Sequence, residues 1–169
     1  MGTTDVVPNA QSAFHTLSLQ FGAFFGDFVS FIVIFFAVLF FALYFGRDRI
    51  APLIAALYAA LALYVAFPYM APLGGNPYLE IGVYVIMAVL GFMTFSGLSY
   101  FMAAHSGGIF SEVVISILVA GFILAISLHT LPVKDVYTFS AATQALFASP
   151  QAFFWWLVAP LAGLFFLGR

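Results

Sequence analysis

Long apolar stretches separated by isolated charges make up most of this chain. A transmembrane helix needs about 20 consecutive, mostly apolar residues. From Asp27 onward the chain has five uncharged stretches: residues 28–46, 50–79, 81–111, 113–133 and 136–168. When their ends rich in Gly and Pro are left out, the pattern predicts five helical spans, near residues 28–46, 50–70, 80–103, 111–131 and 151–168. We expect helices because no stretch shows the period-two alternation of a barrel strand.

Turns and helix caps separate the predicted spans. Residues 71–77 combine Pro with Gly and Asn and so predict a turn. Ser111 is a candidate N-cap for the fourth helix, and Ser149 followed by Pro150 predicts the start of the last one. The chain shows no internal repeat, and we expect an all-α transmembrane bundle forming one domain over residues 1–169.

An amphipathic stripe precedes the first span. Its apolar positions are spaced three or four residues apart: Phe14, Leu17, Phe21, Phe24 and Phe28. Residues 13–27 therefore predict an amphipathic helix. It lies on the membrane surface or docks on another membrane protein. Residues 137–148 repeat the pattern more weakly. The N-terminus has no basic region before its apolar run, so we expect no signal peptide.

The fifth span, residues 151–168, is the shortest. At 1.5 Å per residue it covers about 27 Å, and Pro160 interrupts it. It therefore crosses the membrane, re-enters it, or lies in the interface, which makes the bundle five spans or four plus one. Trp155 and Trp156 near its start are typical of an interfacial aromatic belt.

The composition distinguishes a membrane protein from a soluble one. Hydrophobic residues make up 65% of the chain and charged residues 6%, whereas soluble domains have about 45–50% and about 25%. A soluble fold would lack the polar side chains to cover its surface, so we expect an integral membrane protein. The chain's four Lys and Arg residues cannot neutralise a phosphate backbone, which excludes nucleic-acid binding. The absence of Cys excludes disulfides and thiolate metal sites.

The basic residues predict the orientation. With five spans, Arg47, Arg49 and Arg169 fall on one side of the membrane and Lys134 on the other. The positive-inside rule then places the N-terminus outside and the C-terminus inside. We expect a multi-pass protein of a prokaryotic cytoplasmic (inner) membrane.

Three acidic residues are candidates for a polar pathway. Asp27 lies at the start of the first span among several Phe, and an acid in lipid is costly enough to suggest a proton or cation relay. The alternative is an acid at headgroup depth near a helix N-terminus, where the macrodipole favours a carboxylate. Glu80 and Glu112 each open a span after a turn, and the same two interpretations apply to them.

Other chemistry has little support in the sequence. His129 follows Ala125 by four residues, a spacing that some antenna proteins use to ligate chlorophyll; the alternative is an interfacial histidine. Neither His15 nor His105 forms a His-x-x-x-His metal pair. No Gly-x-Ser-x-Gly elbow or catalytic triad is present. We expect no catalytic residues, no metal and no cofactor.

Small residues at helical spacing predict close helix packing. The pairs are Gly22 with Gly26, Ala56 with Ala60, Ala103 with Gly107, and Gly121 with Ala125. The first span is different, because ten Phe occur between residues 21 and 45 on all sides of the helix. Such a helix faces lipid or a large apolar partner.

The layout of the chain resembles a known family. Asp27 starts the first predicted helix, and Gly46, Arg47 and Arg49 follow it before the second helix begins. Residues 67–73, which contain Pro68 and Pro72, and residues 110–132 continue the likeness. This order is similar to that of the colicin V production (CvpA) family. The resemblance implies a short helical membrane protein linked to toxin export and envelope homeostasis.

These patterns predict a non-enzymatic membrane protein. We expect a structural or accessory subunit, or an envelope-associated scaffold, that acts through helix–helix contacts. Its partners are the lipid bilayer and further copies of itself or other membrane proteins. The alternative is a channel or carrier for protons, ions or a small solute, gated near Asp27 and Glu112.

Overall fold

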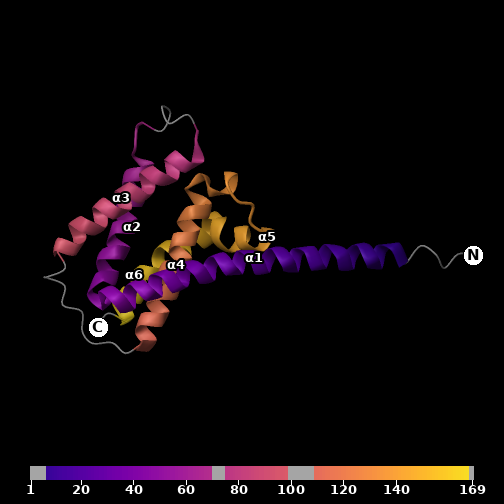
Figure 1. Ribbon diagram of the computed structural model, residues 1–169, viewed down its shortest axis with the longest axis horizontal. Coiled ribbons are helices and arrows are strands. Elements are labelled where there is room, and N and C mark those ends of the chain that lie inside the picture. The colour runs from indigo at the N-terminus through magenta and orange to yellow at the C-terminus, as the bar shows by residue number, and fades with distance from the viewer. Residues whose placement is uncertain (1–6, 70–74, 99–108, 168–169) are drawn as a thin grey trace, which may run out of the picture.

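The computed structural model of the protein describes residues 7–69, 75–98 and 109–167 (Figure 1). All secondary structure in these residues is helical, as the sequence predicts. The elements are α1 (Val7–Phe45), η1 (Arg47–Arg49), α2 (Ile50–Val65), α3 (Pro77–Leu98), α4 (Ile109–His129), η4 (Pro132–Asp135), α5 (Ala141–Thr143), η5 (Gln144–Ala148) and α6 (Pro150–Leu167).

α1 is one unbroken helix of 39 residues, about 58 Å long at 1.5 Å per residue. It joins the predicted amphipathic segment, residues 13–27, to the predicted span, residues 28–46. In Figure 1 its N-terminal half, drawn in indigo, extends alone beyond the other helices. The amphipathic segment is therefore a straight continuation of the span and not a separate helix set at an angle to it.

A glycine ends α1. Gly46 has a φ of +83°, a left-handed conformation that residues with a Cβ rarely adopt. The backbone N–H of Arg49 donates to the Gly46 carbonyl at 3.2 Å and closes the turn η1. This turn lets α2 begin at Ile50 directly after the basic residues.

α2 is shorter than predicted. The predicted span reaches residue 70, but α2 ends at Val65 after 16 residues, which is about 24 Å. Pro68 follows, and a proline disfavours the helical conformation in the residue before it, here Phe67. The prediction of a full-length second span over residues 50–70 is therefore wrong for the helix itself.

α2 and α3 form a closely packed hairpin. A Cβ added to Gly91 of α3 would lie 3.4 Å from Cα and Cβ of Ala56 in α2. Ala56 and Ala60 have no exposed surface. The hydroxyl of Tyr84 donates to the Leu57 carbonyl at 3.3 Å, across the same interface. Small residues on α2 thus bring the two backbones together.

α4 is the central helix of the bundle. α1, α2, α6 and η5 all pack against it, and its buried residues Val119, Phe122 and Ile126 belong to the main core cluster. Tyr58 of α2 stacks on Phe122 with ring centroids 4.6 Å apart. α4 begins at Ile109, so Ser111 lies inside the first turn, and its prediction as the N-cap is wrong.

The C-terminal segment is bent. α5 and η5 form one short helical piece, residues 141–148, which meets α6 at an angle of 57°. Ser149 caps α6, since its hydroxyl accepts from the Ala152 N–H at 3.3 Å, and Pro150 is the first helical residue. The prediction for this helix start is confirmed. Pro160 lies within α6 and is buried.

Within residues 7–69, 75–98 and 109–167, three helical segments are long and apolar enough to cross a membrane: Gly26–Phe45, Pro77–Gly97 and Phe110–His129. The bent pair formed by residues 141–148 and α6 is a fourth candidate, and α2 is a shorter apolar helix. The described residues thus contain three candidate membrane spans, or up to four if the bent pair counts as one, whereas the sequence predicts five. The difference lies in the early end of α2 and in the bend before α6.

The helices alternate in direction. In Figure 1 the turn between α1 and α2 lies at the same end of the bundle as the start of α4. The end of α2, the start of α3 and η4 lie at the opposite end, and α3 packs against η4. α2 therefore runs from one end of the bundle to the other despite its short length.

Candidate functional site: a cavity beside Asp27

Asp27 is buried inside the bundle, with 3% of its surface exposed. It lies far inside α1, which begins at Val7. The interpretation of Asp27 as an acid near the N-terminus of its own helix is therefore wrong. Its Oδ2 accepts a hydrogen bond of 2.7 Å from the backbone N–H of Ser140.

The partner of Asp27 is the start of α5. Ser140 is the N-cap of that helix, and its hydroxyl accepts from the Thr143 N–H at 3.3 Å. The hydroxyls of Ser140 and Thr143 lie 3.1 Å apart. The Gln144 side chain donates to the Phe139 carbonyl at 2.9 Å. Asp27 thus holds a capped turn from the far end of the chain against α1.

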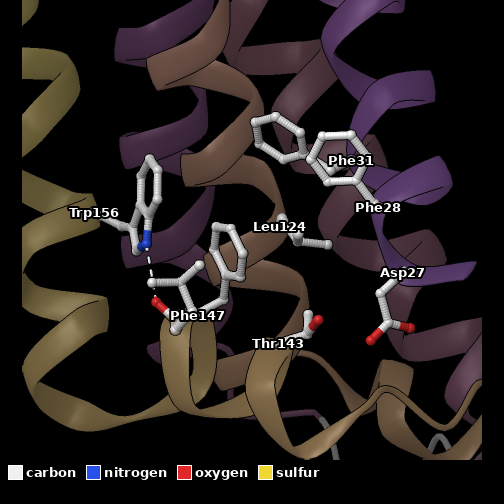
Figure 2. Close-up of a pocket in the computed structure, with 8 residues that line it drawn as sticks. Asp27, Phe28, Phe31, Leu124, Thr143, Phe147 and Trp156 are labelled. Carbon is white, nitrogen blue, oxygen red and sulfur yellow. Dashed lines mark hydrogen bonds between the residues drawn. The ribbon is translucent and has the colours of Figure 1, made fainter. Parts of the chain in front are cut away.

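A cavity of about 240 Å³ lies beside Asp27. Figure 2 shows that its wall comes from α1, α4, the α5–η5 segment and α6. The lining residues are Asp27, Phe28, Phe31, Leu124, Thr143, Leu146, Phe147 and Trp156. Four of these carry aromatic rings, while Asp27 and Thr143 are the polar residues of the wall.

The aromatic rings form a connected wall. Phe147 lies 6.2 Å from Phe31 and stacks on Trp156 at 5.0 Å, measured between ring centroids. The indole N–H of Trp156 donates to the Leu146 carbonyl at 3.1 Å. This bond ties α6 to η5 across the bend, so the cavity wall is held on both sides of it (Figure 2).

Trp155 and Trp156 have different surroundings. Trp155 is 68% exposed, whereas Trp156 covers Gly121 of α4. A Cβ at Gly121 would lie 2.0 Å from the indole ring. Gly121 therefore leaves the space that Trp156 fills. The expected aromatic belt fits the exposure of Trp155, whereas Trp156 is half-buried against Gly121 and Phe147.

Within the described residues, the Ser140 N–H is the hydrogen-bond donor to Asp27, and no Lys, Arg or His forms an ion pair with its carboxyl group. A carboxylate has two acceptor oxygens. Oδ2 is occupied and Oδ1 accepts no hydrogen bond from this part of the chain. The cavity thus combines an apolar aromatic wall with a carboxyl oxygen that has no protein donor there.

The other predicted pathway residues lie elsewhere. Glu80 is in the first turn of α3 and accepts from the Tyr64 hydroxyl at 3.4 Å. Glu112 is in the first turn of α4. Nδ1 of His129 is 2.9 Å from the Ala148 carbonyl, and its ring stacks on Phe153. None of these three residues lines the cavity.

The remaining candidates are placed as follows. Gly26 faces the Tyr137 hydroxyl, 3.5 Å from where a Cβ would be. Ala125 is fully buried in α4, one residue from Leu124 of the cavity wall. Gly22 lies within α1 and Arg47 and Arg49 lie in η1. Ala103, Gly107 and Arg169 lie outside the described residues.

In the part of the chain that the structure describes, no three His, Cys, Asp or Glu side chains gather as metal ligands.

The sequence points to Asp27 but not to the residues around it. The weak apolar stripe over residues 137–148 includes Leu146 and Phe147, and the spacing of Ser140 and Thr143 is that of a helix cap. Both signals exist, but neither says which helix the segment contacts. Nothing in the sequence distinguishes Leu124 from the other apolar residues of α4.

No family model, curated protein or solved structure matches this chain. The similarity of its layout to the colicin V production family stays a prediction.

Proposed function

We propose that this chain is an integral membrane protein that acts as a non-enzymatic accessory subunit, with α1 as the element that contacts a partner. The partner is a further copy of the chain or another membrane protein. The length of α1 carries the proposal, and the exposure of its apolar side chains supports it.

The outer helices support a membrane location. The spans in α1 and α3 bury little of their length inside the bundle, whereas that in α4 is mostly buried. Their exposed residues include Val33, Phe36 and Phe40 on α1 and Ile86 and Leu90 on α3. Exposed apolar surfaces of this extent mark interaction with lipid or with another protein. A bilayer satisfies them without any change in the fold.

The N-terminal half of α1 needs a further contact. Val7 to Phe25 precede the apolar span Gly26–Phe45 and extend beyond the bundle (Figure 1). Helices in proteins gain most of their stability from packing of an apolar face and not from their intrinsic propensity. The spacing of Phe14, Leu17 and Phe21 in the sequence predicts such a face. A partner's helix or the membrane surface would cover it.

The exposed side chains of the α1 span favour a protein partner over lipid alone. They include the rings of Phe28, Phe36, Phe40 and Tyr44, whereas those in the middle of α3 are aliphatic. Helix association in lipid depends on van der Waals packing, and large rigid rings provide much of it in a small area. α1 is therefore the better candidate for an interface, and α3 for a lipid-facing surface.

A photocrosslinking experiment tests this proposal. The chain has no Cys, so a single introduced Cys can carry a benzophenone. Phe36→Cys lies on α1 and Ile86→Cys on α3, with matched exposures of 59% and 61%. In native membranes we expect illumination to convert the Phe36→Cys protein to a discrete larger adduct and the Ile86→Cys protein to none.

Mass spectrometry of the adduct then distinguishes a second copy from another protein. Adducts of equal yield at both positions, or none at Phe36→Cys, would contradict the proposal.

The alternative function, a channel or carrier, has less support from the geometry. Asp27, Glu80 and Glu112 lie in three separate places, and the hydrogen bonds of Asp27 and Glu80 are to Ser140 and Tyr64. No chain of polar groups joins them in the described residues. The buried carboxyl group of Asp27 is the observation that favours transport.

A further inference from the structure

We propose that the cavity beside Asp27 binds a small apolar amine, whose ammonium group contacts Asp27 and whose apolar body lies between the aromatic rings. All the lining residues belong to one chain, so this binding site needs no partner on α1. It therefore stands or falls separately from the accessory function.

The carboxyl group of Asp27 selects for a cation. A buried carboxylate is costly unless it is paired and hydrogen-bonded. Asp27 receives one hydrogen bond, from Ser140, and no ion pair from a basic side chain in the described residues. An ammonium group placed in the cavity would supply the missing positive charge and donate to Oδ1.

The walls select for an apolar body. Phe28, Phe31, Phe147 and Trp156 line the cavity, and the faces of such rings attract a cation as well as apolar groups. Thr143 is the other polar residue of the wall, and its hydroxyl already lies 3.1 Å from that of Ser140. The chemistry is therefore one cation-binding position within apolar walls, and the absence of a basic residue from the lining disfavours a phosphate.

The size of the cavity limits the ligand. Its volume of about 240 Å³ equals the share of about eight water molecules in the liquid, at ~30 Å³ each. A molecule with roughly that number of non-hydrogen atoms fits, such as 2-phenylethylamine. This is smaller than the usual drug-binding pocket.

The cavity opens at the outer surface of the bundle. Two of its lining residues, Phe28 on α1 and Leu146 on η5, are exposed. Leu146 belongs to η5 and not to α1, so its side of the mouth stays open when a partner covers α1, and an amine dissolved in the lipid reaches the cavity there. An ethanolamine headgroup would present the same ammonium chemistry from a lipid molecule.

Trp156 provides a direct readout. The chain has two Trp, and Trp155→Phe leaves Trp156 as the single reporter in the cavity wall. The full chain carrying this change is purified in mild detergent and titrated with 2-phenylethylamine or with the neutral 2-phenylethanol, which has nearly the same shape. We expect a saturable change in Trp156 fluorescence, with the amine binding at least tenfold more tightly than the alcohol.

Two further variants assign the preference to Asp27. Asp27→Asn should reduce binding of the amine to the level of the alcohol, because the amide keeps an acceptor for Ser140 but has no charge. Asp135→Asn changes an exposed acid outside the cavity and should leave the preference intact. An unchanged preference in Asp27→Asn would overturn the role of the carboxyl group.

The affinities of the amine and the alcohol are also compared in the Trp155→Phe protein, in which Asp27 is intact. The proposal therefore remains testable if the Asp27→Asn protein misfolds. Equal affinities, or no saturable change with either compound, would overturn the proposal. Competition by vesicles of phosphatidylethanolamine, but not of phosphatidylcholine, would identify the ligand as a lipid headgroup. Amine binding without such competition would identify a free amine.

Discussion

At the scale of single residues, the contact of Gly121 with Trp156 determines the shape of the cavity. The indole occupies the space where a Gly121 side chain would project. Its N–H is bound to the Leu146 carbonyl, so the ring cannot move away without breaking a hydrogen bond. The same ring stacks on Phe147 of the cavity wall. One glycine on the central helix thus positions an aromatic wall formed by two other elements.

Gly121→Ala is expected to destabilise the protein by about 1–3 kcal/mol, the usual cost of overpacking a core. The added Cβ would lie within 2.6 Å of the indole ring, which must shift and weaken its bond to Leu146. Unfolding in mixed SDS micelles, followed by Trp fluorescence, measures the change. Gly82→Ala is the control, because a Cβ there meets nothing within 4 Å; equal stability of the two variants would contradict the role of Gly121.

At the scale of elements, apolar patterning predicts where helices exist but not how they continue, end or bend. α1 continues through residues 13–45 because no helix-breaking residue separates the amphipathic stripe from the apolar span. The two patterns, considered one at a time, do not show that they belong to one helix. α2 ends early because of Pro68. For the site, the sequence indicates Asp27 from its charge alone. Its partner Ser140 is 113 residues away in the sequence. Local periodicity cannot predict a contact between residues so far apart along the chain.

Ala56→Leu is expected to separate the α2–α3 hairpin and cost about 1–3 kcal/mol. Ala56 has no exposed surface and lies against Gly91, so a larger side chain cannot fit between the helices. Ala62→Leu on the exposed side of the same helix should be nearly neutral. The same unfolding titration, followed by circular dichroism, compares the two; a loss of similar size in both would show that α2 does not depend on close packing at Ala56.

At the scale of the whole molecule, the described charged residues other than Asp27 lie at or near the ends of apolar helices, and the bundle exposes apolar surface. Composition and the apolar pattern were sufficient to predict that the described secondary structure is helical and includes helices long and apolar enough to cross a membrane. The number of spans was not predictable, because α2, at about 24 Å, is shorter than a bilayer core of about 30 Å. The alternation of helix directions in Figure 1 nevertheless places η1 and η4 at opposite ends of the bundle.

Embedding in a membrane is the claim on which the partner contact of α1 and the entry of a ligand from lipid both depend. The alternating helix directions in Figure 1 further predict that α2 crosses the membrane despite its length. Labelling of single cysteines with a membrane-impermeant maleimide tests it most directly. Asp48→Cys in η1 and Asp135→Cys in η4 both place the thiol at exposed positions. We predict that intact cells label Asp135→Cys, and that Asp48→Cys is labelled only after the membrane is opened. Labelling of both positions from the same side, or release of the protein from membranes by alkaline carbonate, would contradict the account.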